Sequence, residues 1–190
     1  VISHMDRQIG RILDVLKETG QSGDTLVIFT SDHGLAVGSH GLMGKQSMYA
    51  HTIRVPLIMA GPGVPRGKRS SALCYLRDLF PTVCDLVGLP IPGSVEGRSL
   101  KPVIEGGADA VYNEIYGYFR DKQRMVRDSR WKLVHYPHLD RHQLFDLRND
   151  PDEKKDLIGD DRHAGVVRDL KTRLARKMKE WAVSSTGKPE

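Results

Sequence analysis

The sequence predicts an α/β fold, in which a sheet sandwiched by helices is followed by a small antiparallel sheet with a terminal helix. Up to about residue 105, short apolar runs at 25–30 and 55–60 alternate with helical patterns. Beyond that point several short runs follow one another without helices between them, which is typical of an antiparallel sheet. We therefore expect residues 1–105 to form part of an α/β domain and residues 106–190 to form a small C-terminal subdomain.

In the first part, a helix is predicted by apolar residues at helical spacing, with Gly20 as its stop. The apolar positions are Met5, Ile9, Ile12, Leu13 and Leu16. Thr25–Thr30 is a short, β-branched run, the pattern of a strand buried on both faces of a parallel sheet. Val55–Ala60 predicts a second core strand. Leu76–Val87 predicts a helix that Pro81 either kinks or opens over its second half.

In the second part, the proline- and glycine-rich stretch Pro90–Gly107 predicts a surface connection. Four partly alternating runs then predict strands, and Asp128–Arg130 predicts a hairpin turn between the second and the third. The runs are Val111–Tyr116, Gln123–Arg127, Trp131–Tyr136 and Gln143–Leu147. A terminal helix is expected over Val166–Trp181, and its apolar stripe consists of Val167, Leu170, Leu174 and Met178.

The composition is that of a globular protein, with 39% hydrophobic and 28% charged residues. No apolar run is long enough to predict a membrane span, and the first residues lack signal-peptide features. The net charge is +5, but the densest basic group, Arg162–Lys179, interleaves acidic residues and predicts a solvated helix face. We therefore expect no nucleic-acid or membrane partner. Cys74 and Cys84 are too few for a disulfide framework and are expected as buried thiols.

The residues that best suit chemistry directly follow the first predicted strand. Asp32 and His33 are an oxygen and a nitrogen ligand type at the strand end, where α/β sheets place their ligands. Ligand softness alone favours zinc or manganese for such a pair. The alternative is that Asp32 caps a turn and His33 forms only local hydrogen bonds. Lys45 follows a loop with four glycines, a combination that suits sulfate or phosphate, although many surface lysines bind nothing.

Other active-site patterns are missing from the sequence. The spacing matches neither a Walker loop nor a Rossmann fingerprint, and there is no Gly-x-Ser-x-Gly nucleophile elbow. From the residues alone, the prediction is a metal and anion site at a sheet edge.

A series of motifs resembles the second half of the sulfatases, members of the alkaline phosphatase superfamily. The series is Asp6–Leu13, Thr25–Gly34, Gly41–Lys45, Ile53–Ile58 and Gly61–Gly63, followed by Asp78–Leu86 and Leu144–Glu153. The resemblance implies an alkaline-phosphatase-like sheet sandwiched by helices. It also implies that Asp32 and His33 ligate a divalent metal, usually Ca²⁺ with Mn²⁺ or Zn²⁺ as alternatives, and that Lys45 contacts the sulfate group.

The resemblance further implies sulfate-ester hydrolysis at a formylglycine made within a Cys/Ser-x-Pro-x-Arg motif. That motif is absent, since neither Cys74 nor Cys84 fits it. The nucleophile is therefore expected on a missing N-terminal part, and this fragment alone is predicted to be inactive. A missing half also predicts exposed apolar faces and self-association of the truncated chain. Resemblance to secreted and periplasmic sulfatases implies such a location for the parent.

Four further residues are candidates for substrate binding. His40, His51 and Arg54 lie near the predicted site in sequence, and His138 lies in a histidine-containing run of the C-terminal subdomain. Structural or solvated roles are the alternative for each of them. Two other functions stay open: a phosphonate monoester or phosphodiester hydrolase of the same superfamily, and a non-catalytic remnant of the fold.

Overall fold

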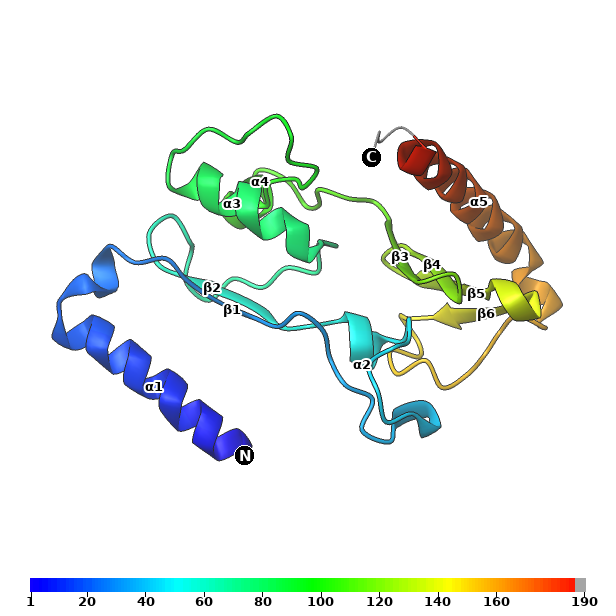
Figure 1. Cartoon of the computed structure of the whole chain (residues 1–190), viewed down its shortest axis with the longest axis horizontal. Coiled ribbons are helices and arrows are strands. Elements are labelled where there is room, and N and C mark those ends of the chain that lie inside the picture. The colour runs from blue at the N-terminus through cyan, green and yellow to red at the C-terminus, as the bar shows by residue number, and fades with distance from the viewer. Residues whose placement is uncertain (187–190) are drawn as a thin grey trace. The chain divides into compact units, whose positions relative to one another are not determined.

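The computed structural model describes residues 1–186, and the chain divides into two compact units (Figure 1). Unit 1 consists of Val1–Ser31, Pro56–Ser70 and Leu76–Asp109. Unit 2 consists of Asp32–Val55, Ser71–Tyr75 and the chain from Ala110 onward. The segment that carries the predicted metal ligands and lysine therefore folds with the C-terminal sheet, although it follows the first strand in the sequence.

The predicted N-terminal helix is confirmed as α1, Ile2–Glu18. Gly20 follows it with a φ of 70°, a left-handed conformation that glycine adopts without steric cost. Within the described residues α1 buries none of its side chains, and Ile12 on its apolar side is 65% exposed. Unit 1 therefore leaves the apolar side of α1 exposed.

The two predicted strands of unit 1 are β1, Val27–Thr30, and β2, Leu57–Ala60. They pair with each other, with Ile28 opposite Met59, but the pairing is antiparallel and neither strand is fully buried. The expectation of a parallel strand buried on both faces is therefore wrong for this sheet. An apolar run indicates that a strand favours burial. Whether the strand is parallel or antiparallel depends on the strand that pairs with it.

The predicted helix at Leu76–Val87 begins later than expected. A 3₁₀ turn, η3 (Leu76–Asp78), leads into α3 (Leu79–Leu86), so the irregularity lies before Pro81 and not in the second half. Pro81 stands in the first turn of α3, where its missing N–H costs no helical hydrogen bond. This corrects the predicted position of the kink.

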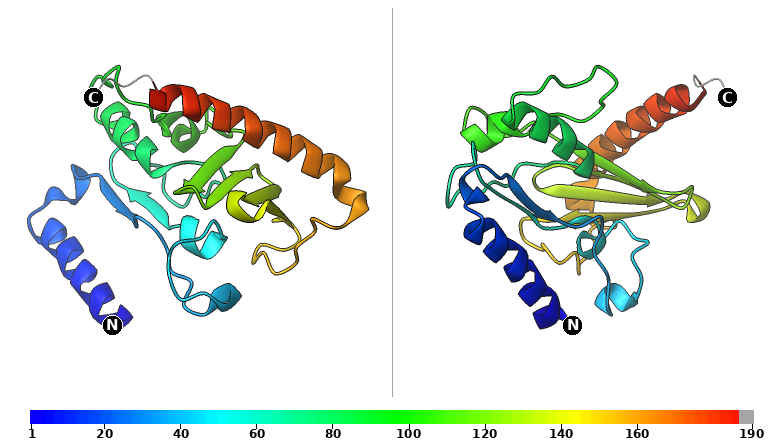
Figure 2. Two further views of the ribbon diagram at one scale, coloured as in Figure 1. Left: turned by 45° about the vertical axis from the view of Figure 1, so that its right-hand side comes forward. Right: turned by 60° about the vertical axis from the view of Figure 1, so that its left-hand side comes forward.

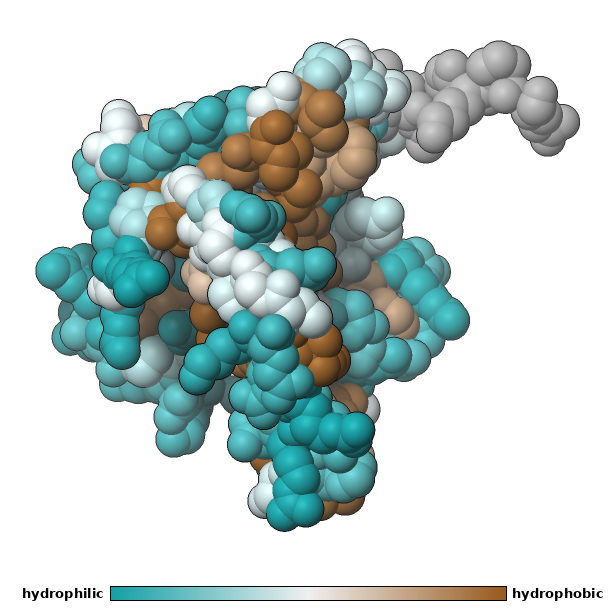
Figure 3. All heavy atoms as spheres, turned by 90° about the vertical axis from the view of Figure 1, so that its left-hand side faces the viewer, coloured by the Kyte–Doolittle hydropathy of each residue, from teal (hydrophilic) through white to brown (hydrophobic). Residues whose placement is uncertain are grey.

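The stretch expected as a surface connection contains a short helix, α4 (Lys101–Glu105), and buries Leu100. The N–H of Leu100 donates to the hydroxyl of the buried Thr82 at 2.9 Å, and the N–H of Arg98 donates to the carboxylate of Asp78 at 2.9 Å. The connection is thus fastened to α3. Apolar surface remains exposed on the face seen in Figure 3, and unit 1 contributes Phe80, Val87 and Leu89 to the exposed apolar residues.

The C-terminal sheet is confirmed as an antiparallel meander of four strands in the order β3-β4-β5-β6, although its first strand begins at Ile115 and not at Val111 as predicted. The strands are β3 (Ile115–Phe119), β4 (Gln123–Arg127), β5 (Trp131–Tyr136) and β6 (Arg141–Asp146). Asp128 closes the predicted hairpin turn, because its carboxylate accepts from the N–H groups of Arg130 at 2.9 Å and Trp131 at 2.7 Å.

The predicted terminal helix is confirmed as α5, Ala164–Thr186, and it lies along the sheet in both views of Figure 2. Leu170 and Leu174 are buried against Val126, Leu133 and Leu144 of the sheet. The other face of the sheet forms a second core, in which Met125, Val134 and Phe145 pack with Met48. That second core joins the sheet to the segment between Asp32 and Val55.

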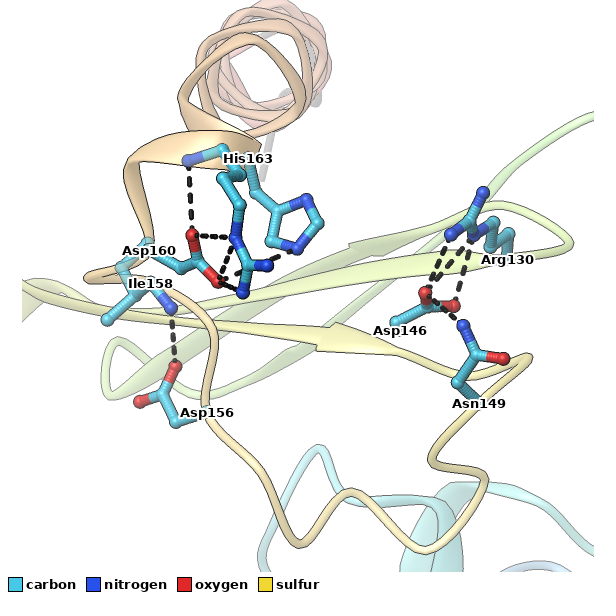
Figure 4. Close-up of polar contacts among 8 residues, drawn as sticks. Arg130, Asp146, Asn149, Asp156, Ile158, Asp160 and His163 are labelled. Atoms are coloured by element: carbon cyan, nitrogen blue, oxygen red, sulfur yellow. Dashed lines mark hydrogen bonds and ion pairs between the residues drawn. The ribbon is translucent and has the colours of Figure 1, made fainter.

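Carboxylates hold the chain after β6 in place (Figure 4). Asp146 accepts from the guanidinium of Arg130 at 2.8 Å and from the amide of Asn149 at 2.9 Å. Asp156 accepts from the N–H of Ile158 at 3.0 Å. Among the described residues, no helix combines the length and the apolar character needed to cross a bilayer.

Candidate active site

The candidate site begins where the chain leaves β1. Asp32 and His33 follow the strand directly, and Gly34 then donates its N–H to the carbonyl of Thr52 at 2.8 Å. A side chain at Gly34 would overlap the carbonyl oxygen of His51. Only glycine allows the backbone to approach the short helix α2 (Ala50–Ile53) this closely.

The structure brings Asp32, His33 and Lys45 together. A carboxylate oxygen of Asp32 lies 3.1 Å from Nε2 of His33, and Nζ of Lys45 lies 2.6 Å from the same nitrogen. Nδ1 of His33 lies 3.0 Å from the carbonyl of Gly34, an acceptor, so the imidazole proton is assigned to Nδ1. Nε2 then carries the lone pair and accepts from the ammonium group.

The local contacts that the alternative interpretation expects, a turn capped by Asp32 and local hydrogen bonds of His33, are present as well. The N–H of His33 donates to Asp32 at 2.9 Å, which is a turn contact. Desolvation opposes ionisation of Asp32, but this hydrogen bond and the electrostatic interactions with His33 and Lys45 leave its pKa below the usual value. Asp32 is therefore a carboxylate near neutral pH, in a largely exposed position.

The glycine-rich loop returns Lys45 to the strand end. Its two sides are hydrogen-bonded, from the N–H of Ala36 to Gly44 at 3.0 Å and from the N–H of Gly38 to Leu42 at 2.8 Å. Gly38 has a φ of 96°, which a side chain would strain. Closure of the loop places Lys45 beside His33 although twelve positions separate them.

His40 and His51 lie in an aromatic stack around Tyr49. The rings of His40 and Tyr49 are parallel with centroids 4.0 Å apart, and His51 stands 5.2 Å from His40. His40 also contacts the carbonyl of Glu153 at 3.0 Å, and His51 lies 3.4 Å from the hydroxyl of Ser47. Burial, followed by the charge of His40, lowers the pKa of His51. Both histidines thus hold the loop in place.

The other two candidates are both exposed. Arg54 is exposed directly after α2. His138 is exposed in the turn between β5 and β6, where it pairs with Asp121 at 2.9 Å. Their role in substrate binding stays a prediction.

Sequence reasoning missed the buried pair that supports the site. Lys132 of β5 and Glu153 form an ion pair in the interior, and the second carboxylate oxygen of Glu153 accepts from the N–H of Ala50 at 2.6 Å. Desolvation lowers the pKa of Lys132 to about 8, with Glu153 opposing the shift. No pattern in the sequence marks a lysine in an alternating strand as buried, so this pair could not be found there.

Comparisons with known proteins show which family the chain belongs to. The profile of the family described as N-sulphoglucosamine sulphohydrolase, C-terminal, matches residues 38–180. The chain is 32% identical to N-acetylglucosamine-6-O-sulfatase of Bacteroides thetaiotaomicron over 93% of its own length and 34% of that protein's. The profile match and the fold thus place the chain in the C-terminal part of a sulfatase fold. The chain belongs to the sulfatase family, within the alkaline phosphatase superfamily.

Solved structures show the same relationship. The protein BT4656, solved in complex with its substrate D-glucosamine-2-N,6-O-disulfate, superimposes with a TM-score of 0.83 at 28% identity, over 95% of this chain and 39% of that one. A phosphonate monoester hydrolase from Silicibacter pomeroyi gives a TM-score of 0.76 at 32% identity, over 94% of this chain and 38% of that one. The chain therefore spans less than half the length of each of these proteins.

Proposed function

We propose that this chain supplies one half of the active site of an enzyme that hydrolyses sulfate esters. The observation that carries the proposal is the meeting of Asp32, His33 and Lys45 around one imidazole nitrogen. These are the positions at which the resemblance expects two metal ligands and a sulfate-binding lysine. Lys45 lies twelve positions after His33, and their side-chain contact across the loop supports the proposal.

The donor set fits a divalent cation in part. Asp32 offers carboxylate oxygens, and His33 offers Nε2 once its proton is on Nδ1. Lys45 has to move off Nε2 for a metal to bind there, which its flexible side chain allows. Two ligands do not complete a shell, so the remaining ligands are proposed to come from outside this chain. Ca²⁺ is the first candidate by resemblance, with Mn²⁺ and Zn²⁺ as the alternatives.

In the proposed mechanism each residue has a separate role. Asp32 and His33 hold the metal, which when bound acts as a Lewis acid toward the sulfate oxygens. Lys45 supplies a positive charge that binds the anionic group and stabilises charge developing on it. The nucleophile is proposed to be a formylglycine on a part of the protein outside this chain. The chain alone is therefore expected to bind anions weakly and to turn over nothing.

Sugar sulfates are the substrate class proposed first. The relatives named above include a sulfatase of N-acetylglucosamine and a protein solved with a glucosamine disulfate. A second candidate function is hydrolysis of phosphonate monoesters or phosphodiesters, which the likeness to a phosphonate monoester hydrolase favours. The two candidates share the site and differ in the group that Lys45 would bind.

The test uses the parent enzyme that carries this chain, assayed on an aryl sulfate, a glucosamine 6-sulfate and a phenylphosphonate ester. Replacing Lys45 by Ala should lower kcat/KM for sulfate esters by about 100-fold or more. Asp32→Asn should in addition lower the bound metal, measured by elemental analysis. Lys154→Ala is the matched control, because Lys154 is an exposed lysine paired with Asp152 outside the site.

Three results would contradict the proposal. Preference for the phosphonate ester would favour the second candidate. Equal loss of activity in the Lys45 and Lys154 variants would remove the lysine from the site. A parent that lacks both the nucleophile motif and any esterase activity would favour a non-catalytic remnant.

A further inference from the structure

The hairpin of β5 and β6 places two histidines side by side, away from the candidate active site. His135 and His142 are directly opposite each other in the antiparallel register. Their imidazole rings stack with centroids 4.2 Å apart and planes within 10°. Both side chains are half-buried. Opposed positions on one face bring the two side chains within reach of a common ligand.

The turn between the strands returns a carboxylate to the same place. A 3₁₀ turn, η4 (Pro137–Leu139), ends at Asp140, whose φ of 45° and ψ of 35° are left-handed. This reversal turns the chain back into β6. One ligand atom each from His135, Asp140 and His142 lies within 4.8 Å of the others.

We propose that His135, Asp140 and His142 form a binding site for a divalent transition-metal ion, with Zn²⁺ as the preferred occupant. Imidazole suits zinc, and two imidazoles with one carboxylate supply three of its four tetrahedral positions. The exposed side of Asp140 leaves the fourth position to water. In the parallel stack the nitrogen lone pairs of the two rings lie in parallel planes and do not point at one common ion. One ring therefore has to rotate out of the stack when the ion binds.

This site is separate from the candidate active site. His135 alternates with Val134 along β5, so it shares the sheet face of Leu133, which packs against α5. Val134 faces the opposite side, where it packs with Met48 of the active-site segment. The sheet therefore lies between the histidine pair and the segment that carries Asp32, His33 and Lys45.

The electrostatic surroundings are mixed. Lys171 of α5 and Arg124 of β4 act on His135 with positive charge, while Asp140 acts with the opposite sign. Burial, then His135 and Lys171, lower the pKa of His142 to about 4, so its imidazole is neutral at pH 7 and needs no deprotonation to bind a metal. The carboxylate of Asp140 offsets part of the repulsion between a bound cation and the two basic residues.

A bound ion would link both strands to the turn that joins them. Because the unfolded hairpin does not hold the three ligands together, binding should stabilise the folded state, and the gain should rise with the logarithm of the zinc concentration once it exceeds the Kd. We therefore assign the site a structural role in fixing the β5–β6 hairpin.

The test measures binding of Zn²⁺ to the chain by competition with a chromophoric chelator, in an Asp32→Asn/His33→Ala background that removes the other candidate metal site. His142→Ala and His135→Ala should each weaken binding by about tenfold or more. Asp140→Asn should also weaken binding while keeping the left-handed turn, which asparagine tolerates. His138→Ala is the matched control, since His138 lies in the same turn but pairs with Asp121.

Zinc should also raise the Tm of the background variant and of its His138→Ala derivative, but not that of the His142→Ala derivative. Circular dichroism checks that each variant is folded, and Asp140→Asn keeps the test decisive if a histidine variant is not. Equal zinc affinity in the His138, His135 and His142 variants would overturn the proposal. So would zinc binding that is present in the unchanged chain and lost in the Asp32→Asn/His33→Ala background, since that would assign the ion to the active site.

Discussion

Nζ of Lys132 and a carboxylate oxygen of Glu153 form an ion pair in the interior of unit 2, where each side chain is 1% exposed. Glu153 also binds the segment of the candidate site twice. Its second oxygen accepts from the N–H of Ala50 at 2.6 Å, and its carbonyl contacts Nε2 of His40 at 3.0 Å. The pair thus connects the C-terminal sheet to the loop that positions Lys45.

Replacing Lys132 by Met should destabilise the chain by about 3–5 kcal/mol, because it leaves the Glu153 carboxylate buried without its counter-charge. Urea denaturation followed by circular dichroism measures this loss. Combining it with Glu153→Gln should restore part of the stability, since the double variant buries no charge. Lys154→Ala, which breaks an exposed pair with Asp152, should change stability by no more than about 1 kcal/mol. Similar losses in both lysine variants would contradict the buried role of Lys132.

Gly34→Ala should disturb the candidate site directly. The new methyl group would overlap the carbonyl oxygen of His51, so the turn after β1 has to move away from α2. We expect a loss of about 1–3 kcal/mol in the free energy of unfolding and weaker metal binding at Asp32 and His33. Gly44→Ala is the matched control in the same loop, because a Cβ there meets no atom within 4 Å. A neutral Gly34→Ala variant would show that the close approach is not required.

The pair of Asp146 and Arg130 (Figure 4) predicts that the free energy of unfolding decreases at low pH. The Arg130 guanidinium, opposed by desolvation and helped by Asn149, lowers the pKa of Asp146 from 3.8 to about 2. The unfolded state therefore binds the proton more readily, and the stability from this group is present above pH 4 and lost as the pH falls toward 2. Asp146→Asn should cost about 1–2 kcal/mol at pH 7, allowing for the exposed side of Arg130, and the difference should vanish near pH 2.

Urea midpoints of the parent and the Asp146→Asn variant at pH 7, 5, 3.5 and 2.5 check this prediction. Exposed Asp152, paired with Lys154, provides a control position. A difference between parent and variant that stays constant over the whole range would contradict the assignment of this decrease to Asp146.

The exposed apolar side of α1 predicts self-association of the isolated chain. Ile12 and Val15 are 65% and 55% exposed, an unusual surface for an amphipathic helix. We expect the apparent mass in size-exclusion chromatography with light scattering to rise with concentration. Ile12→Lys should suppress this rise, whereas Glu18→Gln makes the same change in charge without removing apolar surface. Monomeric behaviour of the parent at high concentration would contradict the prediction.

The local patterns of the sequence determined most elements of this protein. Helical spacing of Leu170 and Leu174 predicted α5 and the face that it buries, and alternation with the turn at Asp128–Arg130 predicted the C-terminal meander. The position of Asp32 and His33 after an apolar run placed a candidate site at the end of β1. Each of these features depends on interactions within a few residues or on burial of one face of an element. A periodic sequence pattern indicates both directly.

The relationships between distant residues were decided only by the tertiary structure. The sequence could not show that β1 runs antiparallel to β2, because both directions bury the same apolar side chains. Nor could it show that the loop closes to bring Lys45 to His33, or that Lys132 and Glu153 pair in the interior. The direction of a strand, the closure of a loop and the burial of a charge depend on contacts between residues far apart in the sequence. The free energy of such contacts is set by the whole folded chain and not by any single element.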